Sequence, residues 1–413
     1  MAFPINKNQA LKQKHFQLSS MSMVNALGTD NSEIFRCITS SAAQNYSSFN
    51  SAILGKKFPI AGIETPLPEV PQRLSSYNSR NFALSLKCLE PMLPEINSLI
   101  EKFGPSRIAV IMGTSTSGIQ EGEDAIRERL NTGNLPADYS YSQQEIGSVS
   151  SGISAALELS GPSYTVSTAC SSSAKVFGSA MGLLDSGLCD AAIVGGVDTL
   201  CGLTLNGFGS LELLSDKVSS PFSKNRSGIN IGEAACIFLL TKEPGGIQLL
   251  SVGESSDAYH FSSPDPEGKG AAAAIQSALE QAGLSAGEIN YLNLHGTGTN
   301  HNDLAEAIAV ANTFGDSVSC SSTKPYVGHT LGASGATELG FTWLILKEYL
   351  KSGRKELHLP LHLFDGEYDE NLPRINLITK ETYLSGLKSA CCISNSFGFG
   401  GSNCSVIISA GLK

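Results

Sequence analysis

Along most of the chain, short apolar runs alternate with segments whose apolar residues recur at helical spacing. Strand-length runs are predicted at 107–115, 164–169, 190–198, 233–241, 248–253, 289–294, 318–321, 390–394 and 403–409. Helices are predicted at 148–161, 170–187, 270–282, 303–311 and 331–349, with Asp303 as the N-cap of the fourth. Strands that alternate with helices indicate an α/β fold with a largely parallel sheet and helices on its faces.

The chain is less regular in two places between these elements. Residues 47–79 and 353–377 are rich in Pro, Ser and Asn or in charge, so both are predicted to be surface excursions. The first 16 residues are polar and lack the apolar core of a secretory signal, which predicts a short tail ahead of the first strand. No apolar run reaches the roughly 18 residues that a membrane span needs, and we expect no span.

Composition narrows the class of protein. The 413 residues suffice for two domains or one large duplicated domain, and 41% hydrophobic residues is typical of a packed globular protein. The formal net charge of −10 argues against nucleic acid, which binds basic surfaces. The cysteines lie mostly in apolar runs and form no CxxC pair, so we expect reduced thiols, no zinc site and a cytoplasmic location.

One cysteine has a setting that suits a nucleophile. Cys170 lies in the run YTVSTACSSSAKVFGSA, where a predicted strand turns into a predicted helix. At such a corner the helix dipole and the free N–H groups favour a thiolate. The small neighbours leave room for a substrate, and the same geometry presents the serine of a nucleophile elbow. The alternative is a buried structural cysteine, and the local sequence alone fits both interpretations.

Two histidines occupy comparable positions. His295 follows the apolar run YLNL and precedes GTGT, whereas His329 follows a Val-Gly pair and precedes an apolar helix. Neutral imidazoles at such turns can donate to a carbonyl oxygen or transfer protons near neutral pH, and with a thiol they predict acyl-thioester chemistry. The other histidines are interpreted as ordinary core or surface residues: His15, His260, His301, His358 and His362.

Two further features accompany these residues. Lys324 precedes His329, and Glu338 follows it inside a predicted apolar helix, where a buried carboxylate needs a partner or a bound cation. The run FGFGG at 397–401 follows a predicted strand and requires turns that glycine adopts easily. Its N–H groups can stabilise an oxyanion. A surface lysine and an ordinary glycine turn are the simpler interpretations.

Four motifs, in their order and separations, resemble the β-ketoacyl–acyl-carrier-protein synthases of the thiolase superfamily, and the elongating type I/II branch fits best. They are VSTACSSS, LNLHGTGT, STKPYVGHTLGASGATE and NSFGFGGSN. The similarity covers nearly the whole chain, from about Phe16 to the C-terminus. It implies an α/β, thiolase-like, five-layered αβαβα fold made of two related halves, 1–245 and 246–413, and an obligate dimer.

The resemblance also implies catalytic roles. Cys170 would hold the growing acyl chain as a thioester, while His295 and His329 would hold the malonyl thioester carbonyl and promote loss of its carboxylate. The resulting enolate would attack the acyl group, which is the reaction of a 3-oxoacyl-[acyl-carrier-protein] synthase in fatty acid, polyene or polyketide-type biosynthesis. Lys324, with Glu338, would order the second histidine and its surroundings.

Other matched positions would support this chemistry. The backbone N–H groups of Cys170 and Phe399 would form the oxyanion hole, in a loop that also contains Gly398 and Gly400, and Phe399 would gate the site. The remaining positions are Thr297 and Thr299 for the pantetheine arm and Asn395 in a supporting role.

The resemblance implies no metal or other cofactor, because the substrates are carried on the phosphopantetheine of acyl carrier protein (ACP). The partners would be ACP and a second ketosynthase-like chain, either another copy or a chain-length factor. Carrier protein is acidic, as is this chain, so docking needs a local basic patch. The candidates, each of which also fits an ordinary solvated arginine, are Arg73, Arg80, Arg127 and Arg129.

Several positions depart from the family pattern. The common FDxxRDGFVxGEGA reads FSKNRSGINIGEAA, so Ser223 and Ser227 replace aspartates and Ile229 replaces a phenylalanine. Asn300 stands where HGTGTPxND has proline, and QLSSMSMVNALG differs from the usual glycine-rich opening. The changed segment lies near the family's acyl pocket, so the preferred chain length stays open. These departures favour a specialised synthase of a secondary pathway over a housekeeping enzyme.

Two other functions are kept as alternatives. One is a non-catalytic partner subunit that sets chain length in a heterodimeric synthase. Such subunits lose the nucleophile, whereas this chain retains Cys170 and both histidines. The other is a Cys-His hydrolase, against which the carrier-specific motifs argue. The acyl substrate and the carrier protein are not identified by the sequence.

Overall fold

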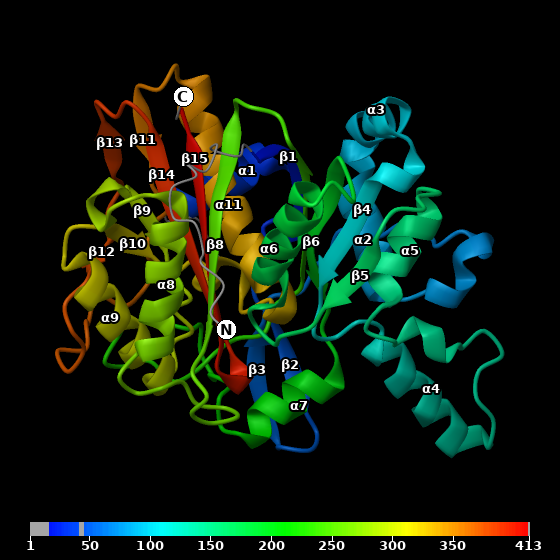
Figure 1. Ribbon diagram of the computed structural model, residues 1–413. Helices are drawn as coiled ribbons and strands as arrows, with labels where there is room; N and C mark the ends of the chain where they lie inside the picture. Colours follow the sequence, from blue (N-terminus) through cyan, green and yellow to red (C-terminus); the bar gives the residue numbers. More distant parts are fainter. Residues whose placement is uncertain (1–15, 41–44, 412–413) are drawn as a thin grey trace, which may run out of the picture.

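The computed structural model describes residues 16–40 and 45–411 (Figure 1). The predicted tail 1–15, with His15, lies outside the described residues. Eleven described strands form one hydrogen-bonded order, β12-β10-β9-β14-β15-β8-β1-β7-β6-β4-β5. Their bounds are β1 Gln17–Asn25, β4 Ile108–Gly113, β5 Ser163–Val166, β6 Ala191–Asp198, β7 Ala234–Thr241, β8 Ile247–Ser256, β9 Tyr291–Asn293, β10 Ser319–Ser321, β12 Asn376–Leu377, β14 Ala390–Gly398 and β15 Ser402–Ala410.

The order contains the same pattern twice. We number the strands of each set from 1 to 5 in chain order. The spatial order is then 3-2-4-5-1 both for β5-β4-β6-β7-β1 and for β10-β9-β14-β15-β8. The two sets meet where β1 and β8 pair at Gln17 and Gln248 alone, so two sheets are joined at one edge. The division into halves 1–245 and 246–413 remains a proposal, and this matching order supports it.

The prediction of a largely parallel sheet is wrong. The outer pairs β5-β4, β4-β6, β14-β9, β9-β10 and β10-β12 are parallel. The central pairs, from β6-β7 through β1 and β8 to β15-β14, are antiparallel. Antiparallel neighbours can be joined by short turns, and the turn at 399–401 joins β14 to β15 in this way.

Helices form the other layers. The central layer is α6 (Ser172–Asp185) and α11 (Ser334–Lys351), which share one apolar core with both sheets. The outer layers are α2 (Arg80–Leu89), α3 (Leu93–Phe103) and α5 (Ser148–Ala156) on the first sheet, and α8 (Lys269–Ala282) and α9 (Asn300–Phe314) on the second. The predicted αβαβα fold is confirmed.

Alternation along β4 shows how the sequence produces these layers. Ala109 and Ile111 belong to the central core, whereas Ile108 and Val110 belong to the core beneath α2 and α5. Successive side chains of a strand point to opposite faces, and both faces here are covered by helices. A continuous apolar run is therefore required, and Ile108–Gly113 is buried throughout.

Several elements were not predicted. They are α1 (Asn31–Ile38), α2, α3, α4 (Ile119–Thr132), α7 (Gly202–Ser210), α10 (Lys324–Val327) and the strands β2 (Ser47–Ser51), β3 (Lys56–Ile60), β11 (Glu356–His358), β12 and β13 (Tyr383–Ser385). The segment 47–79 is more than a surface excursion, because its strands form a hairpin and Phe58 is buried beside Ile229 and Leu331.

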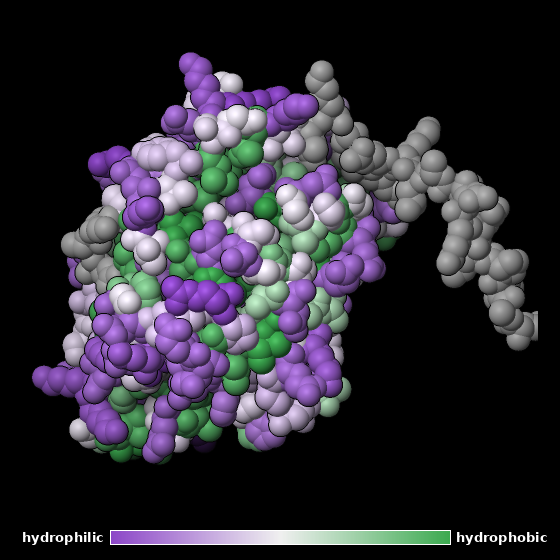
Figure 2. Space-filling view, turned by 90° about the vertical axis from the view of Figure 1, so that its left-hand side faces the viewer, coloured by the Kyte–Doolittle hydropathy of each residue, from purple (hydrophilic) through white to green (hydrophobic). Residues whose placement is uncertain are grey.

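Most predicted element ends differ from the structure by a few residues, and three of these differences concern named helix ends. The helix predicted at 148–161 ends at Ala156, and the helix predicted from Cys170 begins at Ser172. Asp303 is not an N-cap, because α9 begins at Asn300 after Thr299. Among the described helices, none combines the length and the apolar character that a membrane span requires. Figure 2 views the side nearest α9 and β13, where hydrophilic residues are mixed with smaller hydrophobic patches.

Candidate active site

Cys170 lies in a tight turn between β5 and α6. Ala169 adopts a left-handed conformation with φ of 52°, and α6 begins two residues after the cysteine. The hydroxyl of Ser172 accepts from the N–H of Thr168 at 2.9 Å, which closes the turn. The predicted strand–turn–helix presentation is therefore confirmed, with the helix starting slightly later.

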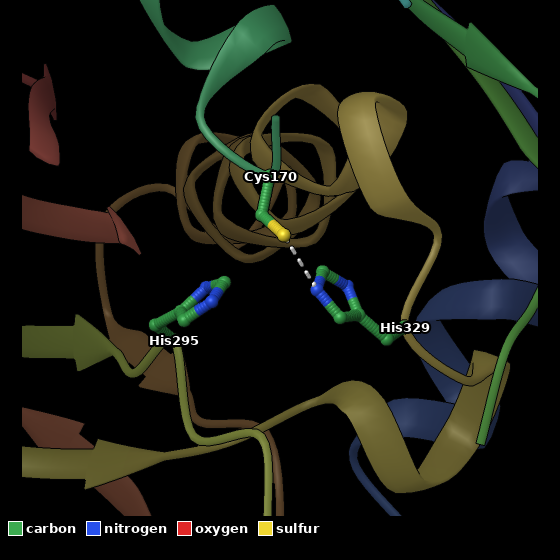
Figure 3. Close-up of side chains that lie close together, drawn as sticks. All are labelled: Cys170, His295 and His329. Carbon is green, nitrogen blue, oxygen red and sulfur yellow. Dashed lines mark hydrogen bonds between the residues drawn. The ribbon is translucent and has the colours of Figure 1, made fainter. Parts of the chain in front are cut away.

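The thiol and both histidines meet around one space (Figure 3). The Cys170 Sγ lies 3.0 Å from Nε2 of His329. One ligand atom from each of Cys170, His295 and His329 lies within 4.8 Å of the other two, and all three side chains are buried. The two imidazole rings are 5.4 Å apart at an interplanar angle of 84°. The sequence thus identified three side chains that the fold brings together although Cys170 and His329 are 159 residues apart.

Lys324 contacts the first histidine, not the second as expected. Its Nζ lies 3.2 Å from Nδ1 of His295, donates to the His295 carbonyl and is 2.5 Å from Oε1 of Glu338. An ammonium has only donors, so Nδ1 of His295 accepts and the ring proton is on Nε2. The buried pair of Lys324 and Glu338 thereby sets the tautomer of His295.

Burial decides the ionisation of this site. It raises the pKa of the Cys170 thiol to about 11, although Lys324 and the N–H of Phe399 lower it. The expected thiolate is therefore wrong for the resting site, where the thiol is neutral and can donate to His329. Burial also places the pKa values of both imidazoles well below the ordinary range, aided by the charge of Lys324. Both rings are neutral near pH 7.

The glycine-rich loop closes over the cysteine. The N–H of Phe399 hydrogen-bonds the Cys170 sulfur. A Cβ at Gly398 would lie 2.9 Å from the Thr168 carbonyl and 3.2 Å from the Cys170 nitrogen, so only glycine permits this approach. Gly400 has φ of 81° and needs glycine for that different reason.

A cavity of about 240 Å³ leads to the three side chains. Thr297 and Thr299 line it, and their hydroxyls are 2.9 Å apart. His301 also lines it, so its interpretation as an ordinary histidine missed this position. Among the departures from the family pattern, Ser227, Ile229 and Asn300 line the same cavity, whereas Ser223 bonds Asp365 at 3.0 Å.

Glu306 is a site residue that the sequence analysis missed. Its carboxylate accepts from the N–H groups of His295 and Gly296 at 2.8 and 2.7 Å, and Asn395 donates to it at 3.3 Å. Burial raises the pKa of Glu306 to about 7 against these hydrogen bonds. Asn395 thus contacts the carboxylate of Glu306, which holds the backbone of His295. Only the position of Glu306 in the helix after His295 could have indicated this role.

The candidate docking arginines do not form one free patch. Arg80 binds both oxygens of the buried Glu233, at 2.8 and 2.7 Å, and Arg73 donates to the carbonyls of Ala155 and Ala156. Arg127 is paired with Asp124, and Arg129 is exposed on the same helix. Two of the four therefore hold the fold together.

The remaining histidines and cysteines fit structural roles. His362 is buried, accepts from the Ser322 N–H and lies 3.0 Å from the Pro221 carbonyl. His358 stacks on Tyr383 with ring centroids 4.1 Å apart. All ten cysteines are free thiols, as expected.

Comparison with known proteins gives two family matches. Residues 79–244 match the family model described as "Beta-ketoacyl synthase, N-terminal domain". Residues 248–351 match the model described as "Beta-ketoacyl synthase, C-terminal domain". The two matched regions contain Cys170, His295, His329 and Lys324.

Individual relatives agree with these matches. A 3-oxoacyl-[acyl-carrier-protein] synthase 2 of Staphylococcus aureus is 30% identical over 315 residues, 72% of this chain and 75% of that protein. The enzyme of the same name from Rhizobium meliloti is 33% identical over 270 residues, 61% of each chain. A ketosynthase structure from Xenorhabdus doucetiae, in complex with its chain length factor, has a TM-score of 0.89 at 44% identity, covering 97% of this chain and 99% of that one.

Proposed function

The chain belongs to the β-ketoacyl synthase family of condensing enzymes, and from this premise we propose that it is a 3-oxoacyl-[acyl-carrier-protein] synthase. It joins malonyl-ACP to an acyl chain held as a thioester on Cys170. The single observation that carries the proposal is the meeting of the Cys170 sulfur with two neutral imidazoles at one cavity. Neutral donors suit the chemistry because they stabilise an enolate oxygen without holding the malonyl carboxylate in place.

The first step is acyl transfer. The Cys170 thiol gives its proton to Nε2 of His329, 3.0 Å away, as the sulfur attacks the acyl-ACP carbonyl. The bond between that carbonyl and the carrier sulfur then breaks. His329 returns the proton to the departing pantetheine thiolate, so the imidazole is neutral again. The high pKa of the resting thiol makes this proton transfer necessary.

The second step is decarboxylation and condensation. After the first step the neutral His329 ring carries its proton on Nδ1, and proton exchange with solvent moves that proton to Nε2. Nε2–H of His295 and Nε2–H of His329 then hold the malonyl thioester carbonyl. Carbon dioxide leaves as the electron pair of the broken carbon–carbon bond forms the enolate. The enolate carbon attacks the acyl-Cys170 carbonyl, and the carbon–sulfur bond breaks. The released thiolate takes a proton from solvent, and 3-oxoacyl-ACP is the product. Lys324 and Glu338 support this step by keeping the proton of His295 on the nitrogen that faces the cavity.

The glycine-rich loop serves the two acyl transfers at Cys170. The N–H groups of Cys170 and Phe399 form the oxyanion hole, and Gly398 and Gly400 allow the loop to approach that closely. The Phe399 ring lies 5.5 Å from the Phe208 ring and gates the cavity. Thr297 and Thr299 bind the pantetheine arm along the cavity wall. Asn395 supports His295 through Glu306.

We further propose that the working unit is a dimer in which this catalytic chain pairs with a chain-length factor. The similar Xenorhabdus doucetiae ketosynthase was solved in complex with its chain length factor. Retention of Cys170 and both histidines makes this chain the catalytic member. A homodimer is the alternative. Departures at Ser223, Ser227 and Ile229 favour a polyene or polyketide-type pathway.

The proposal includes a cytoplasmic enzyme that needs no metal or other cofactor, its substrates being carried on the phosphopantetheine of ACP. The residues assigned here, together with protons exchanged with solvent, account for each proton and electron pair of both steps. The ten free thiols are in keeping with a reducing compartment.

Partial reactions test the function. The purified protein, with and without a candidate chain-length factor, is incubated with malonyl-ACP and acyl-ACP, and CO₂ and 3-oxoacyl-ACP are measured by mass spectrometry. Cys170→Ala should abolish condensation and retain CO₂ release. His295→Ala and His329→Ala should lower CO₂ release by about 100-fold, because each removes a donor to the enolate oxygen. Cys37→Ala, a thiol on α1 remote from the cavity, is the matched control and should behave like the wild type.

Elongation by Cys170→Ala would contradict the role of Cys170. Unchanged CO₂ release in both histidine variants would remove their assignment. Free fatty acid as the main product, with no 3-oxoacyl-ACP, would favour a Cys-His hydrolase.

A further inference from the structure

A buried carboxylate at the end of β6 connects segments on both sides of the active site. Asp198 is fully buried, and one of its oxygens accepts from the hydroxyl of Thr114, the N–H of Ser115 and the N–H and hydroxyl of Thr116, at 2.5 to 2.9 Å. Its other oxygen accepts from the N–H of Gly332 at 2.5 Å. Five donors converge on one carboxylate that touches none of the catalytic side chains.

On one side, the hydrogen bonds around Asp198 extend through Ser115 to the turn that contains Cys170. The hydroxyl of Ser115 donates to the carbonyl of Ala169 at 3.2 Å. Ala169 is the residue with φ of 52° that turns the chain into Cys170. A left-handed alanine is strained by about 1–2 kcal/mol and needs such a contact to persist.

On the other side, Asp198 is hydrogen-bonded to the turn that follows His329. Gly332 follows His329 by three residues, in a turn where Leu331 has φ of 50°. A Cβ at Gly332 would lie 2.6 Å from the Ser115 nitrogen and 2.8 Å from Oδ2 of Asp198, so the turn is packed directly against the cluster. The Cys170 turn and the His329 turn are thus held by the same carboxylate, although they belong to different halves of the fold.

We propose that Asp198 is a positioning residue that holds the Cys170 sulfur at hydrogen-bond distance from His329, acting through Ser115 on one side and Gly332 on the other. The inference rests on the proposed function, since it assumes that this sulfur–nitrogen contact activates the thiol. Asp198 has no contact with substrate in this role.

Loss of the charge of Asp198 and loss of its positioning contacts would change the rate of Cys170 alkylation in opposite directions. Lys324, Glu338 and Asp198 are the charged groups that act on the Cys170 thiol, and the negative charge of Asp198 raises its pKa. Removing that charge alone would lower the thiol pKa and speed alkylation near neutral pH. Loss of positioning would slow alkylation, because the sulfur leaves its proton acceptor. The direction of the change therefore separates the two explanations.

The experiment measures the alkylation of Cys170 by iodoacetamide across pH 6 to 9, with peptide mass spectrometry locating the modified cysteine. Asp198→Asn and Ser115→Ala should each lower the rate by about fivefold or more at every pH, the equivalent of one lost hydrogen bond. Ser115→Ala is informative because it removes no charge. Asp190→Asn, at the other end of β6, and Ser186→Ala, a surface serine that also donates to a backbone carbonyl, are the matched controls. Both should stay within about twofold of the wild type.

Folding of each variant is checked by circular dichroism and thermal melting. Wild-type alkylation rates in folded Ser115→Ala would overturn the inference, as would faster alkylation in Asp198→Asn. If Asp198→Asn does not fold, Ser115→Ala decides alone. Because alkylation needs no carrier protein or malonyl group, a failure of the condensation assay would leave this result readable by itself.

Discussion

At the scale of single residues, the site depends on one ammonium whose donors are all used. The Nζ of Lys324 contacts the ring and carbonyl of His295 and the carboxylate of Glu338. Both Lys324 and Glu338 side chains are only 3% exposed. Removing one partner of such a pair leaves the other charge buried and uncompensated, whereas replacing both with apolar residues can be neutral.

We therefore predict that substitutions of Lys324 and Glu338 will affect the free energy of unfolding and the rate of decarboxylation differently. Lys324→Met should lower the free energy of unfolding by about 3 kcal/mol, because Glu338 loses its partner. The double variant Lys324→Met/Glu338→Leu should recover most of that stability, as measured by urea unfolding. Decarboxylation should remain impaired in both variants, because His295 no longer has a donor at Nδ1. A double variant that regains full CO₂ release would show that Lys324 serves stability alone.

The residue scale also shows what sequence could identify. Cys170, His295 and His329 stand in motifs whose neighbours restrict the backbone, so their presentation was predictable. The partner of Lys324 was not, since a flexible side chain can reach either histidine and only the fold decides. Glu306 was missed because a buried glutamate in a helix resembles any other helical residue until its hydrogen bonds to His295 are seen.

At the scale of elements, the glycine-rich loop between β14 and β15 contains two glycines with different physical requirements. Gly398 has an ordinary extended φ of −109° but lies against the Thr168 carbonyl and the Cys170 nitrogen. Gly400 has φ of 81°, and nothing lies within 4 Å of its potential Cβ. One position is restricted by space and the other by backbone conformation.

The two glycines predict a matched pair of variants. Gly398→Ala should push the loop away from the proposed oxyanion hole and lower the rate of Cys170 acylation by about tenfold or more, like the loss of an oxyanion donor. Gly400→Ala should lower stability by about 1 kcal/mol and affect acylation less, since the cost is local strain. Single-turnover acylation and thermal melting measure the two effects. Equal loss of acylation in both variants would contradict this distinction.

Element order explains the main error of the sequence-based fold. In the sequence, each strand followed by a helix was recognisable as an apolar run followed by apolar residues at helical spacing. This pattern correctly indicates parallel neighbours in the outer parts of each sheet. The pairing of β1 with β7, more than 200 residues later, leaves no local pattern, and this non-local contact makes the centre antiparallel. Polar surface helices such as α4 were missed because most of their residues are not buried.

At the scale of the whole molecule, α4 and α7 expose large apolar side chains, and we call this surface the α4–α7 face. Ile126 and Leu130 on α4 are 58% and 81% exposed, and Leu203 on α7 is 60% exposed. The carboxylate of Glu123 accepts from the N–H groups of Gly202 and Leu203, which holds these two helices together. The edge strand β5 carries Tyr164, 38% exposed, and leads directly to Cys170. Unpaired strand edges and apolar patches are features of protein interfaces.

The proposed dimer should therefore depend on this face. Burying a leucine side chain contributes about 1.5–3 kcal/mol, so Leu130→Glu and Leu203→Glu should each weaken dimerisation by about tenfold or more. Size-exclusion chromatography with light scattering, alone and with the chain-length factor, measures the change. The control is Leu188→Glu, which replaces a similarly exposed leucine, 57% exposed. Leu188 lies just before β6, whereas α7 follows β6, so this variant should leave the dimer intact. Dimers unaffected by the α4 and α7 variants would place the interface elsewhere.

The separation along the sequence of the side chains proposed to be catalytic has a consequence for biosynthesis. Cys170 precedes its proton acceptor by 159 residues. At about 5–20 residues per second, the ribosome makes that stretch in about 8–30 s. During this interval the nascent polypeptide has Cys170 without His329, so the thiol lacks the proton acceptor that lies 3.0 Å from it in the folded protein. We therefore expect the acyl transfer proposed for Cys170 to begin only after His329 has been made and its turn has packed beside the cysteine.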